Sequence, residues 1–446
     1  MIFAAYLFLI ALSFLHPIEA FAPGLAVYRP VLVLSLLVLA FAAISAIGSG
    51  RMAARPRHLI LLGCFAAIIA FSRIANGWTG GAIDALIDFG ATAVLFLVTI
   101  FAVTSIRRLK VTCALIALCM TMLAVAGIAA FHTGFMKDSL LVHETVDAED
   151  DLAVTAPDVI PSEDTSGLTL WRVRSWGFLS DPNDFAQAMI VALPLLAGIW
   201  TRRRRLRNML CVWLPGGFLL YAIYLTHSRG ALLGLAAVLL FSLLRRAGVM
   251  RTGMLVAALG IAAVFVGFTG GRSYSSGGES AGGRIEAWSE GMDMMRSNPL
   301  FGVGYGNFTD NFPLTAHNSF VLCFSELGLT GYFVWLSMLV LAFKETKVSA
   351  TMAQAESDEA RWARLLRLSL IGFLVCAWFL SRTYQPVLFI LLALCTASWH
   401  CAQPVVEPES ARELVPLHWP ATTVKLMLAS IVVIYFIVRF QNAFVR

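Results

Sequence analysis

Apolar and polar residues alternate along this chain in long blocks rather than in short periods. Runs of roughly 20 apolar residues, a length that crosses a bilayer as a helix, recur along the sequence. They lie near 1–15, 30–48, 59–75, 83–105, 111–131, 184–200, 208–226, 230–244, 252–270, 318–343, 364–380, 385–399 and 424–439. Main-chain amide and carbonyl groups find no water inside lipid, so each run is expected to satisfy them as a helix. The pattern predicts an all-α fold, a polytopic transmembrane bundle of about 12–13 helices.

Composition supports this fold class. Of the 446 residues, 59% are hydrophobic and 13% are charged, and the mean hydropathy is +0.79. Soluble domains carry about 25% charged residues. We therefore expect one integral membrane domain over residues 1–446, in contact with membrane lipids. The net charge of +6 does not predict a nucleic-acid partner, because the Lys and Arg clusters flank the apolar runs.

The same basic clusters predict the orientation of the chain. Short loops rich in Lys and Arg face the cytoplasm. Such loops are found at 51–58, 107–110, 202–207 and 245–251. With the N-terminus inside, they alternate consistently from the first run to the tenth. Two longer loops, 132–183 and 271–316, and the turn 226–231 then lie on the external side. The side of the C-terminus stays open, since the last run can cross the membrane or lie along its surface.

Candidate chemistry lies at the external ends of the helices. A charged side chain near membrane depth is costly, so each one is a functional candidate. The first cluster is "WRVRSWGFLSDPNDFAQA" (171–188). Arg172 and Arg174 precede a turn, and either Asp181 or Asn183 is placed to cap the helix that follows. The alternative interpretation is a helix start with flanking arginines.

The second cluster is "THSRGALLG" (226–234). Arg229 opens a helix from the external side, where the positive-inside tendency makes an arginine unusual. An interfacial anchor is the alternative interpretation. His227 and Ser228 are adjacent in sequence and point in different directions, so they do not form a nucleophile–base pair.

The third cluster, "GGRIEAWSEGMDMMRSNPLFGVGYGNF" (282–308), predicts a short amphipathic helix followed by tight turns. Arg284 on that helix carries a planar fork of donors that suits a pyrophosphate group. The solvated face of a surface helix is the alternative interpretation. The glycine-rich "GVGYGNF" follows no predicted strand, so it does not indicate a dinucleotide site.

The fourth cluster heads the run "AHNSFVLCFSELGLTG" (316–331). His317 is predicted at the external end of a helix, with Asn318 as a possible cap. A neutral imidazole can remove a proton from a hydroxyl group, whereas an interfacial or packed histidine is the alternative. The histidines show no ligand spacing such as HxxxH, so the sequence predicts no metal and no other cofactor.

Taken together, the clusters place arginines and an imidazole on one side of the predicted membrane. Arginines can hold an anionic leaving group, and the imidazole can act as a base. This combination favours transfer from a phosphate-activated donor at the outer face. The donor would be linked to a lipid, because nucleotide donors are cytoplasmic.

At these segments the sequence resembles the O-antigen ligase/polymerase superfamily of bacterial inner-membrane proteins. The motifs that carry the resemblance are "SRGALLGL" (228–235), "NPLFGVGYGNF" (298–308) and "HNSFVLCFSELGLTG" (317–331). The segment "RSWGFLSDPNDFA" (174–186) also looks like the family's segment before a mid-chain helix. The likeness covers roughly residues 170–345, and the order and spacing of the motifs make it fairly specific.

The resemblance implies a metal-independent, inverting glycosyl transfer at the periplasmic face, from an undecaprenyl-pyrophosphate-linked glycan to an acceptor hydroxyl. Arg229 and Arg284 would hold the donor pyrophosphate, and His317 would act as the base on the acceptor. The other substrate-binding residues would be Arg172, Arg174, Asn183 and Asn318. The acceptor would be a lipid A-core in a ligase or another glycan in a polymerase, and the same residues would serve both.

Two other classes of function compete with glycosyl transfer. A transporter or flippase for lipid-linked sugars would place charges at mid-membrane along several helices. Here the charges lie mostly at helix ends, with Asp84 and Asp88 as exceptions. A non-catalytic scaffold would not explain the external arginines. The segment from Gly282 to His317 is shorter than the loop that ligases of this family often carry, which leaves the acceptor open.

Overall fold

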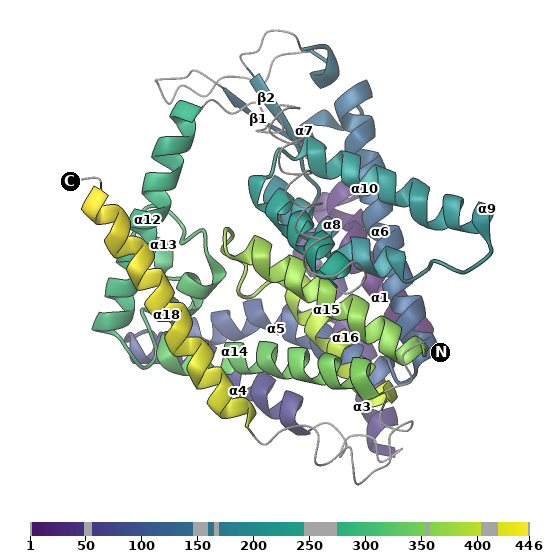
Figure 1. Ribbon diagram of the computed structural model, residues 1–446. Helices are drawn as coiled ribbons and strands as arrows, with labels where there is room; N and C mark the ends of the chain where they lie inside the picture. Colours follow the sequence, from purple (N-terminus) through teal and green to yellow (C-terminus); the bar gives the residue numbers. More distant parts are fainter. Residues whose placement is uncertain are drawn as a thin grey trace.

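The computed structural model describes residues 2–48, 56–145, 159–164, 169–244, 274–352, 357–402 and 418–444. Most of these residues belong to helices that pack into a bundle (Figure 1). The helices of the first half are α1 (Ile2–Leu15), α2 (Pro17–Phe21), α3 (Pro30–Gly48), α4 (Pro56–Ala75), α5 (Thr79–Ala102), α6 (Ile106–Thr133), α7 (Lys137–Leu140), α8 (Pro182–Ala197), α9 (Arg205–Asn208) and α10 (Leu214–Leu225). Those of the second half are the helix Arg229–Leu244, α12 (Tyr274–Ser297), α13 (Phe308–Asn311), α14 (Ser319–Met352), α15 (Asp358–Ala377), α16 (Pro386–Ala402) and α18 (Trp419–Phe444). The remaining elements are the strands β1 (Leu141–Thr145) and β2 (Thr169–Val173), the 3-10 turns η1 (Pro23–Tyr28), η3 (Pro161–Glu163) and η4 (Gly177–Leu179), and the π turn η5 (Met209–Trp213).

Every apolar run predicted from the sequence is helical, apart from 252–270, which lies outside the described residues. Six helices in the described part are long and apolar enough to cross a membrane, namely Arg57–Ala75, Thr79–Ala102, Ile106–Thr133, Arg205–Leu225, Ser319–Thr351 and Trp419–Phe440. Shorter apolar helices are Ile2–Leu15, Pro30–Ser45, Arg229–Leu244 and Pro386–Ala402. The predicted all-α, polytopic helical fold is confirmed.

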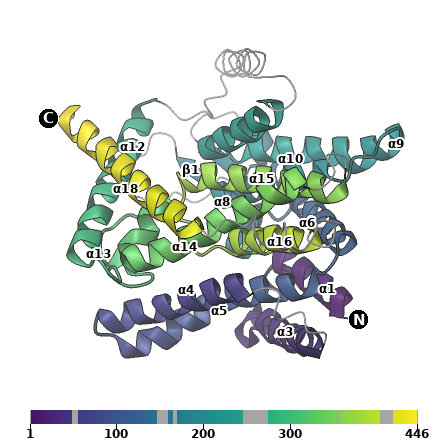
Figure 2. The same ribbon diagram turned by 60° about the horizontal axis from the view of Figure 1, so that its bottom comes forward.

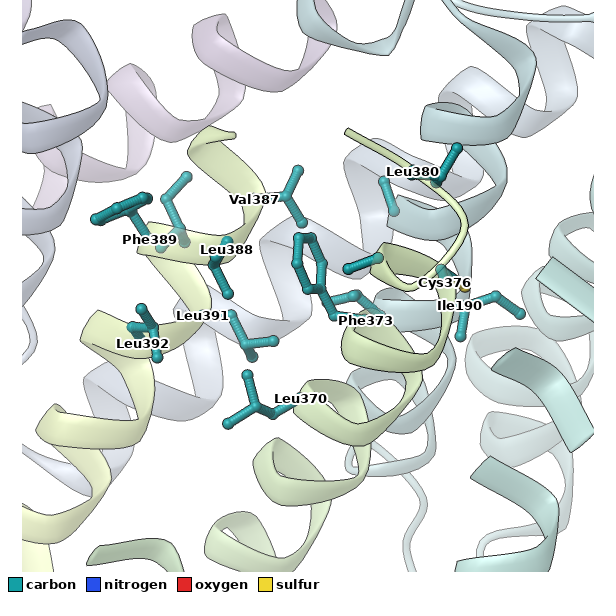
Figure 3. Close-up of a cluster of buried hydrophobic side chains, with 14 of the residues drawn as sticks. Ile190, Leu370, Phe373, Cys376, Leu380, Val387, Leu388, Phe389, Leu391 and Leu392 are labelled. Carbon is teal, nitrogen blue, oxygen red and sulfur yellow. The ribbon is translucent and has the colours of Figure 1, made fainter. Parts of the chain in front are cut away.

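The core of the bundle lies where α15 packs against α8, α14 and α16. Phe373 and Leu370 of α15 lie together with Leu388 and Leu391 of α16, and Ile190 of α8 lies alongside (Figure 3). Figure 2 shows α3, α4 and α5 side by side as a layer next to this core. Lipid chains are as apolar as leucine, so such helices associate through close packing rather than through the hydrophobic effect.

A glycine permits one of the closest helix contacts. A methyl group at Gly234, in the helix Arg229–Leu244, would lie 2.5 Å from the Cys376 Sγ of α15. Small residues allow helix backbones to approach in this way inside a membrane. The contact fixes α15 against the helix that carries Arg229.

The described parts of the basic loops, 56–58, 107–110 and 202–207, lie at one end of the bundle, which we call the basic end. There, His58 Nε2 in α4 lies 2.7 Å from Glu345 Oε1 in α14. Lys110 in α6 pairs with Asp358 in α15. Arg361, also in α15, donates to the last carbonyl of α8 at 3.1 Å. These contacts hold together segments that the charge pattern assigns to one side of the membrane.

The opposite end carries a small sheet that the sequence did not predict. β1 and β2 pair antiparallel, with Leu141 opposite Val173. Both strands belong to the predicted external loop 132–183. A methyl group at Gly127 of α6 would lie 2.3 Å from the Val173 Cγ1, so the hairpin rests directly on that helix. The other predicted external loop, 271–316, carries α12 and α13.

Candidate functional site

His317 lies two residues before Ser319, the first residue of α14, and α12 packs against that helix. The backbone of His317 is left-handed, with φ 47°, and its side chain is half-buried. The carbonyl of Ala316 accepts a 2.9 Å hydrogen bond from the Nε1 of Trp288 in α12. Arg284 lies four residues before Trp288, so the two share a face of this helix. The predicted amphipathic helix is thus α12, with Trp288 buried and Glu286 exposed.

Charges around His317 favour a neutral imidazole. Burial is the largest cause that lowers the pKa of His317, and the positive charge of Arg284 lowers it further. Asp181 acts in the opposite direction, while Arg382 again lowers the pKa. Such effects require nearby charges, so the side chains of Arg284, Asp181 and Arg382 lie in the vicinity of His317. The neutral imidazole is the form that can accept a proton.

Arg382 is a site residue that the sequence analysis did not single out. It lies in the turn between α15 and α16, and its main-chain N–H donates to the Ser319 hydroxyl at 2.8 Å. Its Nε donates to the carboxylate of Asp184 in the first turn of α8. Arg382 therefore joins α8 to the head of α14, beside His317. Like Arg229, it is an arginine at an end of an apolar run on the side opposite the basic loops, a signal that was visible in the sequence.

Asn318 caps α14, as its position in the sequence suggested. Its Oδ1 accepts hydrogen bonds from the main-chain N–H groups of Phe320 at 2.9 Å and Val321 at 3.1 Å. These are donors that the start of a helix leaves open. The cap fixes the path of the chain as it enters the helix from His317.

Arg172 and Asn183 meet in the structure. Arg172 projects from β2 and is 5% exposed. Its guanidinium donates to the Asn183 Oδ1 at 3.1 Å and to the Thr226 carbonyl at 2.9 Å. It therefore links the hairpin to α8 and to the end of α10. Arg174, two residues further along, donates instead to two main-chain carbonyls of α7, at 3.1 and 3.2 Å.

Asp181 is the residue that caps α8. Its carboxylate accepts the N–H of Asn183 at 2.7 Å. The helix begins at Pro182, so Pro182 and Asn183 lie inside its first turn rather than before it. Proline suits the first helical position because the N–H that it lacks would have no helical partner there.

Arg229 is the exposed first residue of its helix. Ser228 caps this helix, since its hydroxyl accepts the N–H three residues further on at 3.4 Å. A methyl group at Gly230 would lie 3.5 Å from the Phe379 Cβ. Arg229 therefore lies next to the chain segment that leads into the turn of Arg382.

The glycine-rich segment 298–308 closes over a break in α14. Gly328 interrupts this helix with φ 64° and ψ −168°, a conformation essentially restricted to glycine. The break frees main-chain groups, and the segment satisfies them. Val303 donates its N–H to the Ser325 carbonyl at 2.9 Å, and the Leu329 N–H donates back to the segment at 2.8 Å. Two motifs that the sequence set apart, 298–308 and 317–331, are one structural unit.

Glu326 is a second residue that the sequence analysis missed. Its buried carboxylate accepts a hydrogen bond from the Tyr384 hydroxyl at 2.8 Å and one from the Phe308 N–H at 3.3 Å. A buried carboxylate needs such partners. These bonds tie the glycine-rich segment and the turn of Arg382 to α14. A lone acid in an apolar run was the signal that could have identified it.

The fold and this site define a multi-pass helical membrane protein in which His317 and a small group of arginines, Arg229, Arg284 and Arg382, lie opposite the basic end. Residues 214–336 match the family model described as O-antigen ligase. The resemblance to the O-antigen ligase/polymerase superfamily is thereby confirmed, and the chain carries a domain of this type. The matched region includes Arg229, Arg284 and His317. Comparison with curated proteins gives no match to this chain.

Proposed function

We propose that this protein transfers a glycan from an undecaprenyl-pyrophosphate-linked donor to an acceptor hydroxyl, at the periplasmic face of the bacterial inner membrane. The observation that carries the proposal is His317, whose pKa is lowered by burial and by the neighbouring Arg284. Both residues lie opposite the basic end, and the positive-inside rule places the basic end in the cytoplasm. A donor that reaches them there must be carried by a lipid.

In the proposed reaction, His317 takes the proton of the acceptor hydroxyl. The acceptor oxygen attacks the anomeric carbon of the donor from the face opposite the pyrophosphate. The bond between that carbon and the pyrophosphate oxygen breaks, and undecaprenyl pyrophosphate leaves with the bonding electrons. Attack and departure on opposite faces invert the configuration at the anomeric carbon.

Arginines hold the leaving group in this proposal. Negative charge grows on the pyrophosphate as its bond to the sugar breaks, and guanidinium groups can bind it through paired hydrogen bonds. We assign this role to Arg229 and Arg284. Because their fixed charge stabilises the leaving group, the proposed transfer needs no metal ion. Arg382 is a positioning residue that also adds positive charge beside His317.

The remaining candidates position these groups or contact the substrate. Asn318 uses its Oδ1 as a cap, while its buried Nδ2 has no hydrogen-bond partner within the described residues. A buried donor without a partner is unfavourable. A substrate oxygen that accepted a hydrogen bond from this Nδ2 would therefore strengthen substrate binding. Arg172 and Asn183 hold each other at the start of α8, and Arg174 anchors the hairpin. We assign these three to the wall of the substrate site.

Removing the base or one leaving-group arginine tests the proposal. We expect His317→Ala to reduce transfer by about 10²–10⁴-fold, the usual range for a general base, and Arg284→Ala by about 10²–10³-fold, the range for a group that stabilises charge in the transition state. The surface-glycan ladder on a gel and the amount of each variant in the membrane are the two measurements. Arg296→Ala is the matched control, because Arg296 lies on the same helix, is exposed and pairs with Asp293. Normal ladders from both site variants would refute the assignment.

Two acceptors suit the same donor site. A ligase would use a lipid A-core hydroxyl, and a polymerase would use a second lipid-linked glycan. Reconstitution of the purified protein with one donor and each acceptor in turn distinguishes them by the product formed. Transfer that persists in the presence of a chelator is expected for the metal-independent reaction.

A further inference from the structure

A pocket lies at the basic end, away from the site of His317. Its volume is about 510 Å³, within the range of pockets that hold small ligands. The residues that line it are Trp200, Arg203, Arg204, Arg205, Asn208 and Trp213. Three of these side chains are positively charged, and none of the lining residues in the described part of the chain is acidic. The pocket is therefore suited to an anion.

The loop that carries these arginines is held in shape by Asn208. The Nδ2 of Asn208 donates to the Thr201 carbonyl at 2.6 Å, and its Oδ1 accepts the Thr201 N–H at 2.9 Å. Arg203 adopts a left-handed backbone with φ 66°, which residues other than glycine rarely do. Hydrogen bonds between the Thr201 main chain and the Asn208 side-chain amide thus hold the loop in shape. The guanidinium groups that line the pocket are not needed for this.

Among the residues that the structure describes, the arginine side chains of the pocket have no acidic partner. Within the described ranges, Arg203, Arg204 and Arg205 take part in no ion pair. The neighbouring Arg207 differs from these three, because its guanidinium donates a hydrogen bond to the Ile199 carbonyl at 3.0 Å. The three guanidinium groups around the pocket are therefore a concentrated positive charge without internal compensation, which favours an external anion.

The pocket lies at the start of a helix that is long and apolar enough to cross a membrane. The apolar span Arg205–Leu225 begins with one of its lining residues. Leu206, Met209 and Leu210, which follow, are exposed. Trp200 and Trp213 are 43% and 70% exposed, and tryptophan favours the zone between lipid chains and water. Lipid headgroups occupy this zone, which favours a lipid as the source of the anion.

We propose that this pocket binds the headgroup of an anionic phospholipid. The arginines donate hydrogen bonds to the phosphate oxygens, a geometry that suits the guanidinium group. The two tryptophans contact the glycerol and the upper part of the acyl chains. A zwitterionic headgroup carries a cation next to its phosphate, and that cation would meet the three arginines unfavourably. The site therefore selects lipids with a net negative charge.

Titration of the purified full-length protein with lipid tests the proposal. Binding of phosphatidylglycerol and of phosphatidylcholine is measured by native mass spectrometry in the same detergent. The variant is Arg204→Gln/Arg205→Gln. An arginine that hydrogen-bonds directly to the phosphate should contribute about fivefold in affinity, so the double variant should bind phosphatidylglycerol about 30-fold more weakly. Phosphatidylcholine binding should be weaker from the start and change little.

The matched control is Arg107→Gln/Arg202→Gln. Both residues are exposed at the basic end, and neither lines the pocket, so the variant loses the same charge outside it. Phosphatidylglycerol should bind this control as it binds the unmodified protein. An equal loss in both variants would refute the pocket, because it would show only the general positive field of this end.

Two further outcomes overturn the assignment to a lipid. One is equal binding of phosphatidylcholine and phosphatidylglycerol. The other is inorganic phosphate that displaces phosphatidylglycerol at equal concentration, which would identify a soluble anion as the ligand. If the double variant is not recovered folded, Arg204→Gln against Arg202→Gln gives the same test, with a loss of about fivefold expected.

Discussion

At the scale of single residues, the protonation of His317 depends on charges from several distant segments. Arg284 comes from α12, Arg382 from the turn after α15, and Asp181 from the cap of α8. Burial and both arginines lower the pKa of His317, and Asp181 raises it. The imidazole is protonated below its pKa and neutral above it. In the proposed mechanism, activity should therefore be lost as the pH falls through the pKa of His317, which lies below the ordinary value of 6.5.

Changing these neighbours should move the acidic limb of the pH profile in opposite directions. Arg382→Gln removes a positive charge, so the pKa of His317 should rise and the limb should move to higher pH. Asp181→Asn removes a negative charge, so the pKa should fall and the limb should move to lower pH. Asparagine also caps helices well, so α8 should keep its start. The measurement is the rate of glycan transfer against pH.

Arg382→Lys is the control for this pair, because it keeps the charge beside His317. Its limb should stay where it is in the unmodified protein, even if its rate is lower. Shifts of the same sign in Arg382→Gln and Asp181→Asn would contradict an electrostatic origin. A limb that survives in His317→Gln would show that another group titrates.

At the scale of elements, the site depends on the break in α14. The segment 298–308 fills the break, and Glu326 holds both to the turn of Arg382. The sequence shows Gly328 inside an apolar run, and that run predicts one continuous helix. The break was not predictable, because it is stabilised by hydrogen bonds from a segment that precedes α14 and covers it.

Gly328→Ala should destabilise the protein. A methyl group at this position would lie 2.4 Å from the main chain of Leu300, and the backbone conformation alone costs a residue other than glycine about 1–3 kcal/mol. We expect a lower melting temperature in detergent and less transfer. Gly63→Ala in α4 is the control, because a methyl group there has no neighbour within 4 Å. Equal melting temperatures for the two variants would contradict the role of the break.

The hairpin shows another limit of prediction at this scale. β1 and β2 contain five residues each, and they are far apart in the sequence. No local pattern pairs them, and the prediction for 132–183 was a loop. By contrast, the caps at Asp181 and Asn318 were among the sequence-based expectations, because a cap bonds to residues within its own first turn.

At the scale of the whole molecule, the contacts sort the helix ends into two groups. His58, Lys110 and Arg361 hold the basic end together, and His317 lies at the opposite end. The topology derived from the charge pattern agrees with this grouping. The side of the membrane that each end faces is a prediction, and it rests on the positive-inside rule.

Cysteine labelling tests the orientation. In a background without the eight native cysteines, Glu286→Cys and Arg202→Cys each supply an exposed thiol, one in α12 and one at the basic end. An impermeant thiol reagent should label Glu286→Cys in intact cells. It should label Arg202→Cys only after the membrane is opened. The reverse pattern would place the site of His317 in the cytoplasm and exclude the proposed periplasmic transfer.

The class of fold and the long apolar helices were predictable from the sequence, because the length of an apolar run and the charges at its ends are local properties. The sequence also indicated His317, Arg284 and Arg229 as candidates, since polar residues at the ends of apolar runs are visible without a structure. Only the tertiary structure decided that Arg382, Glu326 and the hairpin belong to the same region. Their partners lie far away in the sequence, and side chains that meet only through packing leave no local pattern.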